Sequence, residues 1–189
     1  MMNSPGNQRG ALMIEVLITI VICIIGLWGM REVQMRLQAS ELESYQRSQA
    51  LILLDDIYTR MQLNQHQAAS YVTGTNETSV IKTTACPTAS STWADNDLAA
   101  WCAQMQISSE LESDDSQVGG LLGARGCVEQ VDNDEYMLSV AWQGLVAAGV
   151  PPASAACGLG QYDDGNTCTG DQCRRIVTTV LRIGDLSTW

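Results

Sequence analysis

The chain has 189 residues, 46% of them hydrophobic, and its 21 acidic and 10 basic residues give a formal net charge of −11. A chain of this length that also supplies a membrane helix leaves room for one modest globular domain. The acidic balance argues against a nucleic-acid partner, because neutralising phosphates requires clustered Lys or Arg side chains.

A long apolar run follows directly after Gly10. Between Ala11 and Met30 the only charged residue is Glu15. About 20 apolar residues, rising 1.5 Å each in a helix, match the roughly 30 Å hydrocarbon core of a bilayer. We therefore expect a disposable leader over residues 1–10 and a transmembrane helix over residues 11–33.

Glu15 is the most informative residue of this run. A carboxylate deep in hydrocarbon costs at least about 2.5–3.5 kcal/mol on insertion scales, so it normally has a partner. No Lys or Arg lies within the run to pair with it. Cleavage between Gly10 and Ala11 would create a cation, the α-amine of Ala11, at the membrane depth of Glu15 in an axially shifted neighbour.

The segment from Gly10 to Leu17, Gly-Ala-Leu-Met-Ile-Glu-Val-Leu, resembles the class III leader of type IV prepilins. That leader has a Gly, four apolar residues, a Glu and a long hydrophobic run. The resemblance implies that a prepilin peptidase cleaves between Gly10 and Ala11, and that Ala11 becomes the N-methylated first residue. It also implies that Glu15 directs assembly. The chain departs from the family at Ala11, where Phe or Met is usual.

Further segments resemble minor pilins of the PilV type: Ile25–Met30, Gly126–Glu129, Val140–Gly144 and Cys173–Val177. The resemblance implies a type IV pilin fold and a subunit that helps to initiate pilus assembly and modulates adhesion. It further implies a precursor in the bacterial inner membrane, then a place in the extracellular fibre beside the major pilin and other minor pilins. No cofactor is implied.

Two other functions stay open from the sequence. A minor pseudopilin of a type II secretion system would share the leader and the helix. A membrane-anchored adhesin or binding module would use Trp93, Trp101 or the loop over 157–173, and would leave Gly10 uncut. An enzyme is the least supported function, because the lone His66 has no nucleophile or orienting acid nearby in the sequence and reads as a solvated side chain.

The helix is expected to continue beyond the membrane. Residues 31–70 are rich in Gln, Glu, Arg, Leu, Met and Ala, which favour helix. One amphipathic face is indicated by an i, i+3, i+7, i+10 pattern of apolar residues, namely Leu51, Leu54, Tyr58 and Met61. We expect the amphipathic half over 34–70 to pack against a globular head over 71–189, within a single helix that ends near Ala69.

The head is predicted to contain one helix and a small sheet. Residues 93–106 have helical spacing. Segments 126–131, 136–143 and 174–183 are rich in β-branched and aromatic residues, and a short strand is expected over 79–83. Alternation in 136–143 predicts a half-buried strand. Three antiparallel strands packed on the amphipathic half of the helix give an α+β architecture.

Six cysteines lie beyond the apolar run: Cys86, Cys102, Cys127, Cys157, Cys168 and Cys173. An even number outside the cytoplasm predicts three disulfides, although many pairings are compatible with the sequence. We favour Cys86–Cys102 and Cys157–Cys168, which close local loops, together with Cys127–Cys173, which would join two predicted strands. Cys23, in the apolar run, is expected to act as a small hydrophobic residue.

A metal site is not expected. The two nearest cysteines, Cys168 and Cys173, are too far apart in sequence for the usual zinc-binding pair. The Asp-Asp-Gly-Asn segment that begins at Asp163, with Asp171 after it, could supply oxygen ligands to calcium. It lacks the final bidentate Glu of the usual calcium loop, so we interpret it as an acidic turn, and the sequence leaves calcium binding there open.

Overall fold

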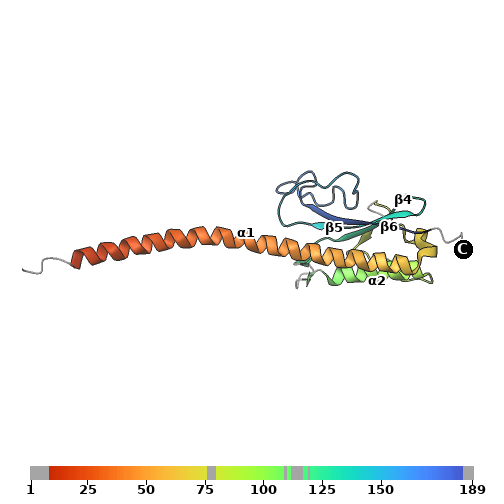
Figure 1. The fold of residues 1–189 in the computed structure, drawn as a ribbon, viewed down its shortest axis with the longest axis horizontal. Helices are drawn as coiled ribbons and strands as arrows, with labels where there is room; N and C mark the ends of the chain where they lie inside the picture. The colour runs from red at the N-terminus through yellow and green to blue at the C-terminus, as the bar shows by residue number, and fades with distance from the viewer. Residues whose placement is uncertain (1–8, 76–79, 109, 112–116, 119, 185–189) are drawn as a thin grey trace, which may run out of the picture. The chain divides into compact units, whose positions relative to one another are not determined.

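The computed structural model describes residues 9–75, 80–108, 110–111, 117–118 and 120–184. It divides into two compact units, Met1–Leu42 and Glu43–Trp189. From here on we call the whole second unit the head, so that the head includes the end of α1 as well as residues 71–189. In chain order the elements are α1 (Arg9–Leu63), the 3-10 helix η1 (Gln65–Tyr71), β1 (Ile81–Lys82), α2 (Trp93–Ile107), β2 (Glu110–Leu111), β3 (Gln117–Val118), β4 (Arg125–Asp132), β5 (Glu135–Gln143) and β6 (Arg174–Arg182) (Figure 1).

The described part of the N-terminal unit is the first portion of α1, which is apolar from Ala11 to Met30 and more polar from there to Leu42. This helix is long and apolar enough to cross a membrane, by length and composition alone. Its large apolar side chains from Met13 to Leu37 are exposed, and the most exposed are Met13 and Trp28, at 76% each. A helix that is apolar on all sides requires apolar surroundings, so the unit is compatible with a membrane anchor. Of the predicted leader, residues 1–8 lie outside the described residues.

The first helix ends earlier than the sequence predicted. Helix α1 stops at Leu63, and η1 follows with a non-helical residue inside it, Gln67. The local reason is the burial of Ala68 and Tyr71, because the chain must turn to bring both side chains into the core. Helical propensity over 31–70 was therefore overridden at its end by tertiary packing.

Within the head, the buried face of α1 is shifted from the predicted one. The side chains that face the core recur at helical spacing: Gln46, Ala50, Leu53, Leu54, Ile57 and Met61. Leu54 and Met61 were predicted correctly, but Leu51 is 49% exposed. The true stripe includes the small Ala50 and the polar Gln46, which a search for large apolar residues overlooks.

The main sheet is antiparallel, with the strand order β1-β4-β5-β6. Three of its strands match the predicted strands, and the short β1 adds a fourth at the edge beside β4, where Ile81 pairs with Gly126. The start of the strand predicted over 79–83 lies outside the described residues. Strands β2 and β3 form a separate two-stranded sheet. The predicted α+β architecture is confirmed at this level.

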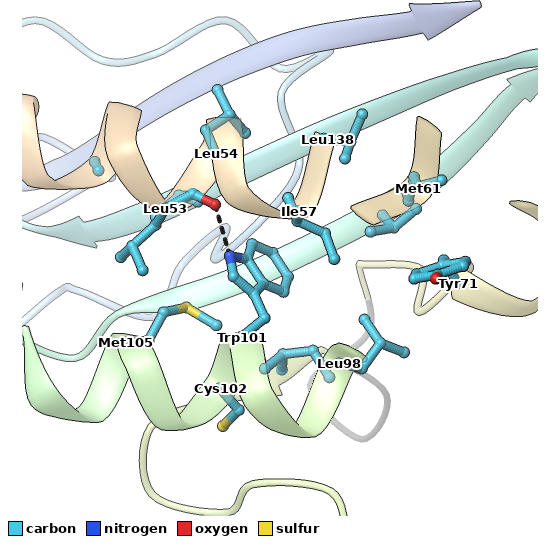
Figure 2. Packing of buried hydrophobic residues seen from close by; sticks show 14 of the residues in the cluster. Leu53, Leu54, Ile57, Met61, Tyr71, Leu98, Trp101, Cys102, Met105 and Leu138 are labelled. Carbon is cyan, nitrogen blue, oxygen red and sulfur yellow. Dashed lines mark hydrogen bonds between the residues drawn. The ribbon is translucent and has the colours of Figure 1, made fainter. Parts of the chain in front are cut away.

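One face of the sheet packs against α1 and α2, as Figures 1 and 2 show. The helix predicted over 93–106 is confirmed as α2, which begins at the N-cap Thr92, whose side chain accepts a hydrogen bond from the backbone N–H of Asp95. Trp101 projects from α2 into this core and is fully buried. Its Nε1 donates a hydrogen bond of 2.8 Å to the carbonyl of Leu53, which ties the two helices together (Figure 2).

The opposite face of the sheet is also covered, so the prediction of a half-buried β5 is wrong. Ser139 and Ala141, which lie on the more polar side of the alternation in 136–143, are 0% exposed. Ala141 belongs to a second cluster with Cys127, Cys157 and Tyr162. The loop between β5 and β6 folds back over this face, and a strand covered on both faces cannot be recognised from alternation alone.

The structure contains three disulfides, of which only Cys86–Cys102 was paired correctly. The other two are Cys127–Cys157 and Cys168–Cys173, in place of the predicted Cys127–Cys173 and Cys157–Cys168. The reason lies in the strand order, because β5 separates β4 from β6. Two strand spacings of about 4.8 Å exceed the Cα separation of roughly 7 Å that a disulfide can span.

Candidate functional site

The sequence-predicted assembly site lies near the start of α1. Gly10 and Ala11 are part of the helical backbone, and Glu15 follows Ala11 by four positions, which places the two positions on one side of the helix. The side chains beside Glu15 are apolar and exposed, with Ile14 at 62% and Ile18 at 54%. The site is therefore a single charged position on an apolar cylinder.

Glu15 has no internal partner within the described part of the chain. No ion pair or hydrogen bond there engages its carboxylate, which is exposed. Thr19, the other polar side chain of the run, donates its hydroxyl hydrogen to the carbonyl of Val16 at 2.9 Å. The Thr19 hydroxyl is thus hydrogen-bonded within its own helix. The Glu15 carboxylate can be paired only by another molecule or by a newly formed N-terminus.

Two further features mark the surface of this helix segment. Gly26 and Gly29 have open space where a Cβ atom would lie, so the backbone is bare at both positions. Bare backbone permits another helix to approach closely. Cys23 is a free, exposed thiol in the same unit. Beyond the apolar run, Arg36 pairs with Glu32 at 2.6 Å, four residues apart on the exposed helix.

The acidic loop that the sequence offered as a calcium candidate is an intramolecular turn. Asp164 accepts hydrogen bonds from the backbone N–H groups of Asn166 and Cys168, each at 2.8 Å, and the bond from Cys168 contributes most to lowering the pKa of Asp164. Asp163 accepts from the N–H of Asp171 at 2.9 Å. These carboxylate oxygens thus shape the loop. Among the described residues, no group of three potential metal ligands comes together.

A buried arginine holds the same loop on the sheet. Arg174 is 0% exposed, and its Nε donates to Asp171 at 3.1 Å. Its Nη1 donates to the carbonyls of Ala155 and Cys157. Burying an arginine is tolerable only when it is paired and hydrogen-bonded in this way. Arg174 lies in the segment Cys173–Val177, and its structural role could not be predicted from that segment alone.

A second polar cluster, which the sequence reasoning missed, lies between the end of α1 and the start of α2. Arg60 donates from Nε to Asp56 at 2.8 Å and from Nη1 to Asp97 at 3.0 Å. Asp97 also accepts a hydrogen bond from the Tyr71 hydroxyl, and Asn64 donates to that hydroxyl at 3.2 Å. The hydrogen bond to Asp56 is the largest influence that holds the pKa of Arg60 above its usual value. The i, i+4 spacing of Asp56 and Arg60 was the available sequence signal.

Two more contacts escaped the sequence reasoning because they join distant segments. Gln46 is fully buried, donating to the carbonyl of Gly120 at 2.7 Å and accepting from Nε1 of Trp142 at 3.3 Å. Arg175, on β6, forms an ion pair with Glu43 on α1. His66 is exposed on η1, which agrees with the prediction of a solvated side chain.

Comparison with known protein families, with curated proteins and with solved structures finds no match to this chain. The function of the chain is therefore inferred from its own residues and geometry.

Proposed function

We propose that this chain is a minor pilin of a type IV pilus, of the PilV type. It is made as a precursor in the bacterial inner membrane, and a prepilin peptidase cleaves it between Gly10 and Ala11. The mature subunit, N-methylated at Ala11, then joins the fibre through α1 beside the major pilin and other minor pilins. Its role is structural rather than enzymatic: it helps to initiate assembly and modulates adhesion.

One observation carries the proposal. Glu15 is a carboxylate with no partner among the described residues, within a helix of membrane length and four positions after Ala11. A charge in hydrocarbon costs at least about 2.5–3.5 kcal/mol, so a position of this kind calls for a partner. The amine released at Ala11 of an adjoining subunit supplies the opposite charge at a matching depth, and no lysine or arginine of the run could do so.

The same electrostatics provide an axial register. Apolar helices can pack against one another at more than one axial offset, whereas an ion pair in a low dielectric depends steeply on distance. A subunit displaced along the fibre would leave a buried carboxylate unpaired, which is strongly destabilising. Glu15 would thus select one axial offset between neighbouring helices.

The arrangement of the rest of the chain is in keeping with this role. The head begins at Glu43, its portion of α1 buries one face against a four-stranded antiparallel sheet, and disulfides fasten its loops. A type IV pilin fold has these parts: a helix with an apolar half and an amphipathic half, and a small sheet packed on the latter. Disulfides suit an oxidising compartment outside the cytoplasm.

The decisive experiment is intact mass and N-terminal sequencing of protein from peptidase-positive and peptidase-negative cells. We expect peptidase-positive cells to yield a chain that begins at Ala11 with one added methyl group, and peptidase-negative cells to yield the full precursor. The proposal is wrong if the mature protein from peptidase-positive cells still begins at Met1 or Met2.

A pair of helix variants tests the assembly role separately. Glu15→Ala should leave cleavage largely intact and strongly reduce the number of surface pili. Thr19→Val is the matched control, because the Thr19 hydroxyl is satisfied within its own helix and its loss should leave piliation unchanged. Normal piliation by Glu15→Ala contradicts the proposed register. Normal piliation together with lost protein secretion would assign the chain to a type II secretion pseudopilus.

A further inference from the structure

A groove on the head combines exposed apolar side chains with a pre-formed polar network. It is lined by Asp56, Arg60, Leu63 and Asn64 at the end of α1 and by Trp93 and Asp97 on α2. Trp93 is 78% exposed and Leu63 is 84% exposed, although both belong to helices that also contribute buried apolar side chains to the core. A large aromatic ring left in water beside fixed polar groups is a feature typical of ligand sites.

The polar side chains of the groove are hydrogen-bonded to one another and only partly desolvated. The Arg60 side chain is 26% exposed, with Asp56 at 25% and Asp97 at 19%. Asp97 is held in place on its other side by the Tyr71 hydroxyl. Within the described residues, the hydrogen bonds of Arg60 use Nε and Nη1, which leaves Nη2 able to donate to a ligand. Asp56 likewise has a second carboxylate oxygen that can accept.

The arrangement of the charged side chains, with Arg60 between Asp56 and Asp97, restricts the kind of ligand. One guanidinium against two carboxylates leaves one net negative charge, and a cationic group entering beside Asp56 or Asp97 would lie against the guanidinium of Arg60 and lose part of that attraction. An anionic group attracted to Arg60 would meet the two flanking carboxylates instead. A neutral ligand with several hydroxyl groups avoids both penalties, because each hydroxyl can donate to a carboxylate and accept from the guanidinium.

The apolar side chains of the groove restrict the shape of the ligand. A sugar ring in the pyranose form has a rim of hydroxyl groups and a face of C–H groups, and the electron-rich face of an indole attracts such C–H groups. Trp93 is exposed and lines the groove together with Leu63 and the residues of the hydrogen-bonding network. A protein partner is less well matched, because a specific interface needs about 800 Å² on each side, and only two large apolar side chains are available here.

We propose that this groove binds a neutral pyranose unit of a saccharide, with Trp93 as the stacking platform and the Asp56–Arg60–Asp97 network as the hydroxyl-recognition wall. The inference concerns the head alone. It does not depend on the role proposed for Glu15, and it stands or falls separately from it. Because the groove is open and the ligand is a single sugar unit, we expect a dissociation constant of about 1 mM.

The test uses the full chain in a detergent without a sugar head group, and saturation-transfer difference NMR as the readout. The probes are the methyl pyranosides of glucose, galactose, mannose, fucose, N-acetylglucosamine and N-acetylgalactosamine, with glucuronate and glucosamine as charged comparisons. We expect saturation transfer to the ring C–H protons of at least one neutral pyranoside. The charged analogues should give weaker transfer than their neutral counterparts.

Variants identify the site. Trp93→Ala should reduce affinity by about tenfold or more, since stacking on one ring is removed from a weak complex, and Trp93→Phe should retain part of it. The control Leu159→Ala removes another exposed apolar side chain, 55% exposed and outside the groove, and should change nothing. The proposal is overturned if no neutral pyranoside shows transfer, if transfer persists in Trp93→Ala, or if the charged sugars bind better. It is equally overturned if Trp93→Ala instead removes co-purification of a pilus subunit while no saccharide binds.

Discussion

Gly126 on β4 occupies a position where any side chain should destabilise the head. An ideal Cβ at this position would lie 2.3 Å from Cη2 and 2.4 Å from Cζ3 of Trp101, and 3.0 Å from the terminal methyl group of Met105. Gly126→Ala therefore requires the indole or the strand to move. Trp101 is 0% exposed, and its Nε1 is held 2.8 Å from the Leu53 carbonyl, so the ring has little freedom to retreat.

The magnitude follows from these contacts. Overpacking a well-packed core costs about 1–3 kcal/mol, and displacing the indole also weakens a buried hydrogen bond worth about 1 kcal/mol. We expect Gly126→Ala to lower the free energy of unfolding of the head by about 3 kcal/mol, near the upper end of that range. With a urea dependence of about 2 kcal/mol per M, the unfolding midpoint should fall by about 1.5 M.

The assay is urea unfolding of the oxidised full chain, followed by the near-ultraviolet circular dichroism of tryptophan. The control is Gly149→Ala, where nothing lies within 4 Å of the added methyl group, and the expected change is within about 0.5 kcal/mol. Trp101→Phe removes the ring atoms that collide, so the double variant should cost less than the sum of the single ones. Strict additivity, or a wild-type midpoint for Gly126→Ala, refutes the packing described for this core.

Three further outcomes are expected. Replacing both Cys127 and Cys157 by Ser should cost about 3–4 kcal/mol, because the bridge closes a loop with a sequence separation of 30; peptide mass mapping that recovers another partner for Cys127 would contradict the pairing. Burial, followed by the hydrogen bond to a carboxylate, raises the pKa of Tyr71 from 10.0 to about 12, so its contribution to stability is complete below pH 10 and is lost as the pH rises towards 12. The unfolding temperatures of the wild type and of Tyr71→Phe should converge over this range, and a difference that stays constant with pH would argue against it. Glu43→Gln should lower the stability of the head by about 1 kcal/mol, because it weakens the partly buried ion pair with Arg175. An unchanged urea midpoint would show that this ion pair does not stabilise the head.

Local patterns in the sequence were sufficient for the elements whose environment is uniform along their length. The apolar run from Ala11 to Met30 and the spacing within 93–106 depend on composition and on the helical period. Strand β6 could be recognised from its β-branched residues, and its observed range differs from the predicted one by a single residue at the end. The same reasoning singled out Glu15, because a charge in an apolar run is visible without a structure.

Other features were decided by which distant segments cover which surfaces. Strand β5 alternates like a half-exposed strand, yet the loop that carries Cys157 covers its second face. The groove beside Trp93 exists only because α2 is folded against the end of α1, which brings Arg60 within reach of Asp97.

The sequence by itself determined the membrane-length helix, the isolated charge of Glu15 within it and the approximate positions of the principal strands. These features depend on neighbours a few residues apart. The tertiary structure alone decided the disulfide pairing, since Cys127 had to meet a partner on its own side of the sheet. It also decided the register of the buried stripe on α1, where Gln46 is accepted because a backbone carbonyl and an indole N–H lie opposite it. The physical reason is that burial and pairing depend on distances between segments far apart in the chain, which no local pattern encodes.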